Sequence, residues 1–128
     1  MLLLDVSFLE TLEDELVSNR WGRAADALVS RSTETVIISV VTLADFARDR
    51  TNLPAFARFI SHFRRMPLSP AVLDRALWLR TVAADALQGS TLWVAATALA
   101  HGATVVTRIP SFATASRGLV PELRYWNF

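Results

Sequence analysis

Two aspartates stand at positions where a metal-dependent reaction could take place. Asp5 directly follows the apolar segment 2–4, and Asp45 comes shortly after a second apolar segment, 35–39. Both segments have the composition of buried strands, and in an open parallel sheet ligands bind beyond the carboxyl ends of the strands. Carboxylate oxygens are the ligands that Mg²⁺ prefers, and the bound ion can activate water for phosphodiester hydrolysis. The two acids therefore predict a Mg²⁺ site at one edge of a sheet.

Asp45 also has a structural interpretation. Thr42 and Asp45 have the spacing of a capping box, in which two side chains bond free backbone amides at the start of a helix. Asp5 has fewer structural alternatives, because an acid that ends an apolar strand needs partners of its own. Both interpretations of Asp45 stay open on sequence grounds.

A third apolar segment, 103–107, ends in Thr107 and Arg108, which we expect at the same edge of the sheet. The Arg108 guanidinium could contact a phosphate or form an ion pair with a nearby acid. His62 and His101 have no second histidine or cysteine at metal-ligand spacing. The sequence also lacks a phosphate-binding loop, a CxxC motif and a serine–histidine–aspartate triad. Among the kinds of site considered, the sequence therefore supports only one built on carboxylates.

The elements that must position these residues alternate along the chain. Strands separated by helices predict right-handed crossovers and an α/β fold with a central parallel sheet. A capping box of Ser7 and Glu10 predicts the start of the first helix, and Gly102 is expected to end another in the left-handed conformation. The predicted strands are 2–5, 35–39, 103–107 and an edge strand at 122–126, the predicted helices are 7–17, 23–30, 42–48, 53–65, 70–87 and 92–100, and 110–118 is predicted to be a loop.

The composition indicates one domain, residues 1–128, with a large core. The hydrophobic fraction is 52% and cysteine is absent, which fits a reducing cytoplasm. The uncharged stretch 86–107 contains glycine and polar residues, so we expect a buried core unit and no membrane span. The first residues lack the positive charge of a signal peptide. We therefore expect a cytoplasmic protein.

Charge is unevenly spread along the chain. Residues 1–49 hold nine acids and four arginines, whereas residues 50–128 hold three acids and nine arginines. An acidic metal-binding face opposite a basic nucleic-acid face would give this pattern. Ordinary solvated helix surfaces would give it as well.

Three segments of the chain form recognisable motifs: LLLDVS at 2–7, SVVTLADFA at 39–47 and LWVAATALAHGATVVTR at 92–108. Together they resemble the PIN-domain family, which includes the VapC-type ribonuclease toxins. Family members are similar at all three, reading LLLDxS at the first and DxWIAATALxHGxxLVTR at the last. The resemblance implies a single α/β PIN-like domain, with helices on both faces of the sheet. It also implies a Mg²⁺- or Mn²⁺-dependent endoribonuclease, a phosphodiester hydrolase, acting on single-stranded RNA.

The resemblance carries the family's site onto particular residues of this chain. Asp5 and Asp45 correspond to metal-binding, catalytic acids, and Ser7 and Thr107 to polar catalytic positions. Arg108 is then a substrate-binding candidate. The family also implies a homodimer and an antitoxin-like protein partner.

The sequence departs from the family at two further acids. Thr91 stands where the third acid is expected, and the fourth is replaced within 109–111, with Ser111 as the nearest polar residue. Asp45 is also shorter than the usual glutamate. We therefore expect a degenerate active site that binds Mg²⁺ or Mn²⁺ weakly and cleaves RNA weakly or not at all.

Two alternatives remain open. One is a working ribonuclease with a non-standard ligand set, completed by Glu10, Asp49 or Asp85, each of which could equally be a surface acid. The other is an inactive binding module for an antitoxin-like partner.

The aromatic residues give a further expectation. Trp78 and Trp93 lie in apolar helical segments and are expected in the core. The cluster at 125–128 either folds back on the sheet edge or builds a dimer interface. Together with the high apolar content, it predicts a homodimer.

Overall fold

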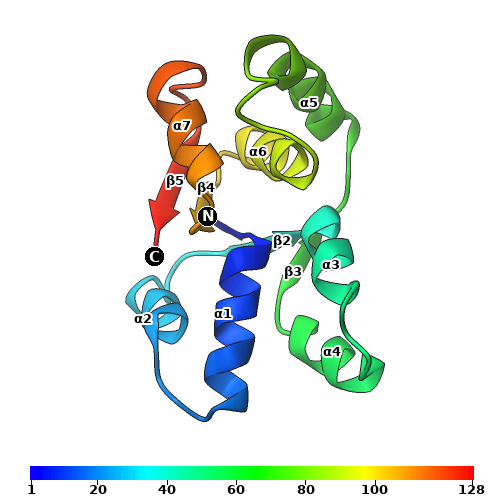
Figure 1. Cartoon of the computed structure of the whole chain (residues 1–128), viewed down its shortest axis with the longest axis vertical. Helices are drawn as coiled ribbons and strands as arrows, with labels where there is room; N and C mark the ends of the chain where they lie inside the picture. The colour runs from blue at the N-terminus through cyan, green and yellow to red at the C-terminus, as the bar shows by residue number, and fades with distance from the viewer.

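A single five-stranded parallel sheet organises the molecule. The computed structural model describes residues 1–128, and the strand order is β3–β2–β1–β4–β5 (Figure 1). The short, all-leucine β1 lies at the centre and pairs with β2 on one side and β4 on the other. The strands are β1 (Leu2–Leu4), β2 (Val36–Ser39), β3 (Arg64–Met66), β4 (Thr104–Thr107) and β5 (Arg124–Asn127).

Helices cover both faces of this sheet, which confirms the predicted α/β architecture. Figure 1 shows α5, α6 and α7 on one side of the sheet and α1, α2 and α4 on the other. The helices are α1 (Val6–Val17), α2 (Arg23–Ser30), α3 (Val40–Ala47), α4 (Leu53–Ile60), α5 (Pro70–Val82), α6 (Ser90–His101) and α7 (Pro110–Gly118).

Alternation along the strands divides the core into two clusters. In β1, Leu3 joins the cluster under α5, α6 and α7, whereas Leu2 and Leu4 join the cluster under the first four helices. Ile37 and Ile38 divide in the same way on β2. A strand buried on both faces must be apolar at every position, which explains the uninterrupted leucines of β1.

The predicted capping boxes are both wrong. Asp5 is the N-cap of α1, since its side chain accepts a hydrogen bond from the Phe8 amide. Ser39 is the N-cap of α3 and accepts from the Val41 amide. Because β1 and β2 pass into their helices without a loop, each cap is the residue at the end of the strand. Asp45 consequently lies inside α3, beyond its first turn.

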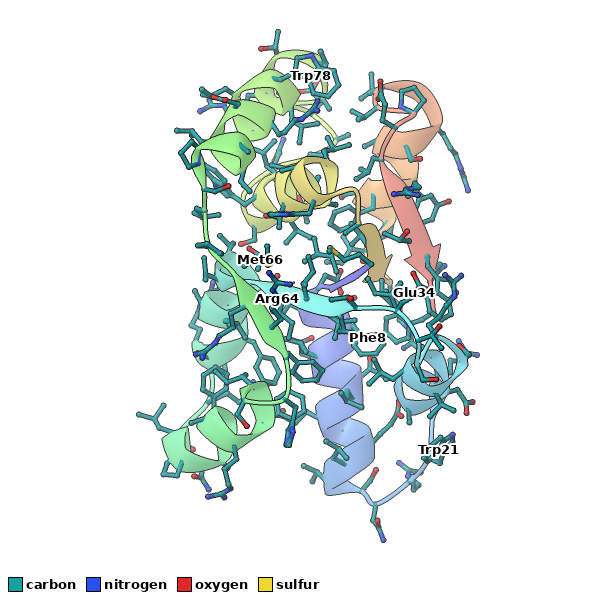
Figure 2. All side chains as sticks on the ribbon, turned by 180° about the vertical axis from the view of Figure 1, so that it is seen from behind. Phe8, Trp21, Glu34, Arg64, Met66 and Trp78 are labelled. Atoms are coloured by element: carbon teal, nitrogen blue, oxygen red, sulfur yellow. The ribbon has the colours of Figure 1, made fainter.

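The predicted helix 53–65 is also wrong in its second half. α4 ends at Ile60, and Arg64–Met66 forms the edge strand β3, paired with β2. Figure 2 shows Arg64 and Met66 on this strand. Two exposed arginines give no sequence signal of a strand. Arg64 and Arg65 are extended because they pair with Ile37 and Ile38 of β2.

The segment 110–118, predicted as a loop, is the helix α7. Pro110 occupies the first turn, where its missing amide is harmless, and Phe112 and Ala115 are buried. The helix predicted over 70–87 ends earlier, at Val82. The left-handed end of α6 at Gly102 is confirmed, with φ of 62°.

The aromatic residues depart from expectation in part. Trp78 is 39% exposed and is not a core residue, whereas Trp93 packs against the core. The C-terminal aromatics fold back: β5 pairs with β4, and the ring of Phe128 lies 4.8 Å from that of Phe8. None of the helices combines the length and the apolar character needed to cross a bilayer.

We predict that Gly102→Ala destabilises the protein by about 1 kcal/mol, because alanine is strained in the left-handed conformation. An added Cβ would meet only the end of Arg124, at 3.8 Å, so the cost is conformational. Urea unfolding measures it. Gly118→Ala is the control, because Gly118 ends α7 without a positive φ and has open space around it. Equal losses in both variants would contradict the prediction.

Candidate functional site

The candidate site lies where the strand order reverses. β2 and β4 flank β1 on opposite sides, so the carboxyl ends of β1 and β4 form the switch point at which open α/β sheets bind ligands. Leu4 pairs with both Ile38 and Val106, so Asp5, Ser39 and Thr107 follow in one row. All three are buried.

Three donors hold the Asp5 carboxylate. Oδ1 accepts hydrogen bonds from the Ser7 hydroxyl at 2.6 Å and from the Phe8 amide at 3.0 Å. Oδ2 accepts from the Thr107 hydroxyl. Because Thr107 is 102 residues further along the chain, this bond joins the first strand to the fourth.

Both hydroxyls are used twice. The Ser7 Oγ accepts from the Arg108 amide at 3.0 Å, and the Thr107 Oγ1 accepts from the Ile109 amide at 2.9 Å. We call Asp5, Ser7 and Thr107, with these backbone amides, the Asp5 network. It fixes the start of α1 and the connection from β4 to α7 in a single hydrogen-bonded unit.

Burial dominates the electrostatics of Asp5. The side chain is 1% exposed, and desolvation raises the pKa of its carboxyl above the ordinary value of 3.8. The hydrogen bonds from Ser7, Thr107 and Phe8 act in the opposite direction and offset part of this rise. No arginine forms an ion pair with Asp5. The network thus satisfies the carboxyl group without compensating its charge.

Asp45 does not join the network. Its carboxylate bonds Arg48 of the same helix, with 2.7 Å between Oδ1 and Nη2, and no hydrogen bond links it to Asp5, Ser7 or Thr107. Glu10, Asp49 and Asp85, the other acids considered, are exposed and likewise form no bond with the network.

The two positions at which the family's acids are missing lie at the starts of two helices. Thr91 and Ser111 are each the second residue of a helix, α6 and α7 respectively. α7 begins just past the carboxyl end of β4, and α6 runs opposite to β4, so both helices start at the same edge of the sheet. Threonine is a good N-cap residue, but the Thr91 hydroxyl does not cap α6. It donates to the Gln88 carbonyl at 2.6 Å and accepts from the Gln88 amide.

The residues present do not fit a magnesium site. No group of three or more histidine, cysteine, aspartate or glutamate side chains gathers anywhere. Three donors already occupy the Asp5 oxygens, which offer about four acceptor positions in all. Mg²⁺ needs hard oxygen ligands in near-octahedral order, and one engaged carboxylate does not supply them.

A basic hollow adjoins the network. It has a volume of about 270 Å³ between β4, β5 and α7, and its lining contains Arg108 and Arg117 but no acid. Neither arginine forms an ion pair, and the Arg108 guanidinium lies 4.7 Å above the Phe128 ring. The sequence left two roles open for Arg108, a phosphate contact and an ion pair with a nearby acid. The structure shows no such ion pair.

Sequence reasoning missed two features of this region. The capping role of Asp5 could have been found, because aspartate is among the best N-caps and directly precedes a helical segment. The hydroxyl of Thr42 on α3 is buried without a hydrogen-bond partner, which no sequence pattern indicated.

Comparison with solved structures shows the fold. VapBC2 from Rickettsia felis, bound to a promoter DNA fragment, matches with a TM-score of 0.75 and 17% identity over 99% of this chain and 98% of that chain. FitAcB from Neisseria gonorrhoeae matches with a TM-score of 0.72 and 23% identity over 99% and 97%. A toxin–antitoxin complex from Klebsiella pneumoniae gives 0.70 and 23% over 96% and 95%.

No family model and no curated protein matches the sequence. The solved structures cover both chains almost completely, so the likeness extends over the whole domain. The fold is that of VapC-like PIN domains, as the sequence motifs suggested.

We predict that Thr107→Val costs about 1–3 kcal/mol of stability, because it leaves the Ile109 amide and one Asp5 oxygen without their partner. Thr104→Val is the matched control on the same strand, since the Thr104 hydroxyl makes no hydrogen bond within the protein. Urea unfolding of both variants checks this. A loss in Thr104→Val as large as in Thr107→Val would refute it.

The raised pKa of Asp5 predicts a pH dependence of stability. The folded protein holds the Asp5 proton more tightly than the unfolded chain does, so this contribution is complete below pH 3.8 and is lost as pH rises through the folded pKa. Relative to Asp5→Asn, the wild type should therefore lose unfolding free energy from about pH 4 upward. Urea unfolding in a metal chelator measures the difference, and parallel pH curves would contradict the assignment.

Proposed function

We propose that this chain is a toxin-type PIN-domain protein whose metal-dependent ribonuclease site is weakened. The observation that carries the proposal is the Asp5 network at the switch point of a VapC-like fold. A carboxylate stands where such a site would begin, while Thr91 and Ser111 add no charge at the two adjoining helix starts. The ancestral reaction would be endonucleolytic cleavage of single-stranded RNA.

Weak metal binding follows from the groups available. Mg²⁺ gives up its waters reluctantly, and Asp5 offers few free acceptor positions. Arg48 already bonds one oxygen of Asp45, and its positive charge would compete with an ion there. Millimolar Mg²⁺ or Mn²⁺ should accordingly raise the melting temperature very little.

The basic hollow supports contact with RNA. Arg108 and Arg117 present two unpaired guanidinium groups beside the Asp5 network, and arginine binds phosphate in bidentate fashion. Tyr125 in the same lining offers an aromatic surface near the arginines. A single strand could be held here whether or not it is cleaved.

An antitoxin-like protein is the second partner that we propose. The similar structures are of toxin–antitoxin systems. This chain carries a groove of about 340 Å³ between α1 and α4, where the apolar Leu16, Val17, Phe56 and Phe59 lie beside the charged Glu13, Asp49 and Arg50. Leu16 and Val17 are 61% and 83% exposed. This groove favours the second candidate function, an inactive module that binds an antitoxin-like partner.

We also propose a homodimer. The C-terminal aromatics are used within the chain, so they no longer support this prediction, but α5 exposes several large apolar side chains. Large exposed apolar patches normally mark interaction surfaces.

The decisive experiment restores the two missing acids. Thr91→Asp with Ser111→Asp should increase metal-dependent cleavage of single-stranded RNA by roughly 100-fold over a weak wild type, because rigid placement of the reacting groups is worth about that much. Aspartate at the second position of a helix also interacts favourably with its dipole, so both changes should be tolerated. Cleavage of a labelled oligonucleotide in Mg²⁺ and Mn²⁺ measures the gain.

Two controls complete the design. Thr91→Asn with Ser111→Asn has nearly the same shape without the charges and should show no gain. Adding Asp5→Ala to the restored protein should abolish its activity. Robust cleavage by the wild type that Asp5→Ala removes would instead establish a working ribonuclease with another ligand set.

A further inference from the structure

A second hollow lies beside the basic one, between α2 and the end of β5. It has a volume of about 300 Å³, which is at the lower end of the range for small-molecule sites. Figure 1 shows the carboxyl end of β5 directed toward α2. Its lining includes Arg23 and Asp26 from α2, and Trp126, Asn127 and Phe128 from the C-terminal segment. We call it the α2–β5 hollow.

The two hollows adjoin each other. Asn127 lines both of them. Arg108 lines the basic hollow, and its guanidinium lies 4.7 Å from the ring of Phe128, which lines the α2–β5 hollow. The surface is therefore continuous from the basic hollow to α2. A strand whose phosphate binds Arg108 can place a neighbouring base in the α2–β5 hollow.

The polar groups of the α2–β5 hollow are available to a ligand. Arg23 and Asp26 are three residues apart on α2, so they are neighbours on its surface, yet neither belongs to any ion pair of the chain. The Asp26 carboxylate accepts one hydrogen bond, from the Trp21 indole, at Oδ1. Its other oxygen is free, because a carboxylate has about four acceptor positions. No hydrogen bond within the protein engages the Asn127 side chain.

Contacts behind the hollow fix its walls. The Glu15 carboxylate of α1 accepts hydrogen bonds from three backbone amides at the start of α2, at 2.9 to 3.0 Å. A Cβ on Gly22 would lie 2.6 Å from the Glu15 Cδ, so glycine is what permits this close approach. On the other wall, the Arg31 guanidinium lies 4.8 Å over the Trp126 ring. The ligand groups are thus held in place before a ligand arrives.

This set of groups matches the edge of a guanine base. Guanine presents two adjacent donors, N1–H and the N2 amino group, beside the acceptor O6. A carboxylate such as Asp26 accepts from the two donors, and an adjacent arginine such as Arg23 donates to the acceptor. Adenine, cytosine and uracil lack an adjacent pair of donors on one edge. The aromatic rings of Trp126 and Phe128 supply the kind of wall on which single-stranded bases pack.

We propose that the α2–β5 hollow binds a guanine base of the single strand whose phosphate contacts Arg108. The inference rests on the RNA contact proposed above and adds a sequence preference to it. It does not depend on metal binding or on cleavage, because the lining of neither hollow includes Asp5.

Binding of strands that differ in one base tests the proposal. Oligouridine with one central guanosine should bind the wild type about tenfold more tightly than the same strand with a central adenosine, because a good bidentate base contact discriminates by about that much. A central inosine lacks the N2 amino group and should give an intermediate affinity. Fluorescence anisotropy in a metal chelator measures each dissociation constant without cleavage.

Three variants separate the base contact from the phosphate contact. Asp26→Asn keeps an acceptor for Trp21 but replaces the other oxygen with a donor, so it should abolish the preference for guanosine. Asp14→Asn is the matched control, because it removes the same charge from an exposed acid of α1 outside both hollows, and it should retain the preference. Arg108→Gln should weaken binding of all strands alike, as loss of a phosphate contact does.

The outcomes distinguish the two proposals. Equal binding of the guanosine and adenosine strands would overturn the guanine site and leave the RNA contact standing. A preference that persists in Asp26→Asn would also overturn the hollow as its source. Failure of every strand to bind would overturn the RNA contact and the guanine site together.

Guanosine itself distinguishes an RNA base from a free nucleoside as the occupant. It reaches only one hollow, so it should bind at least about tenfold more weakly than the guanosine strand, which engages two linked contacts. Equal affinity of guanosine and the strand would assign the hollow to a free nucleoside and overturn its role in RNA binding.

Discussion

The burial of one carboxyl group at the centre of the sheet is the constraint on which the rest of the structure depends. Asp5 follows the central strand, and no cation accompanies it. A buried polar group must be hydrogen-bonded or it costs several kcal/mol, and here two hydroxyls and an amide meet that requirement. The same two hydroxyls bind the amides that follow β4. One side chain thus links the first helix, the central strands and the connection to α7.

This solution has a chemical consequence. Acceptor positions that bond Ser7, Phe8 and Thr107 are not free for a metal ion, and Asp45 is engaged by Arg48. Additional acids at positions 91 and 111 would repel a buried Asp5 unless an ion compensated their charge. Neutral side chains there relieve that repulsion. Stability without metal and tight metal binding are therefore opposing demands on this edge of the sheet.

Three surface regions surround the sheet: the basic hollow, the groove between α1 and α4, and the outer side of α5. Arg108 and Arg117 bring positive charge beside the Asp5 network, whereas the groove between α1 and α4 and the exposed leucines of α5 lie on opposite sides of the sheet. The proposed contacts with RNA and with an antitoxin-like protein therefore use separate places on the surface. The uneven charge along the sequence contributes to this, since both arginines of the hollow belong to the basic half of the chain.

Local pattern in the sequence determined the parts of the fold whose causes are local. The apolar segments that end at Asp5, Ser39 and Thr107 are strands, Gly102 ends a helix, and the motifs together indicated the family fold. Tertiary structure alone decided the rest, because the causes lie far apart in the chain. β3 exists through its pairing with β2, and α7 is held by the burial of Phe112. Asp5 and Asp45 were both candidate metal ligands in the sequence. Only the register of the parallel strands brought Thr107 to Asp5, while the turn of α3 brought Arg48 to Asp45.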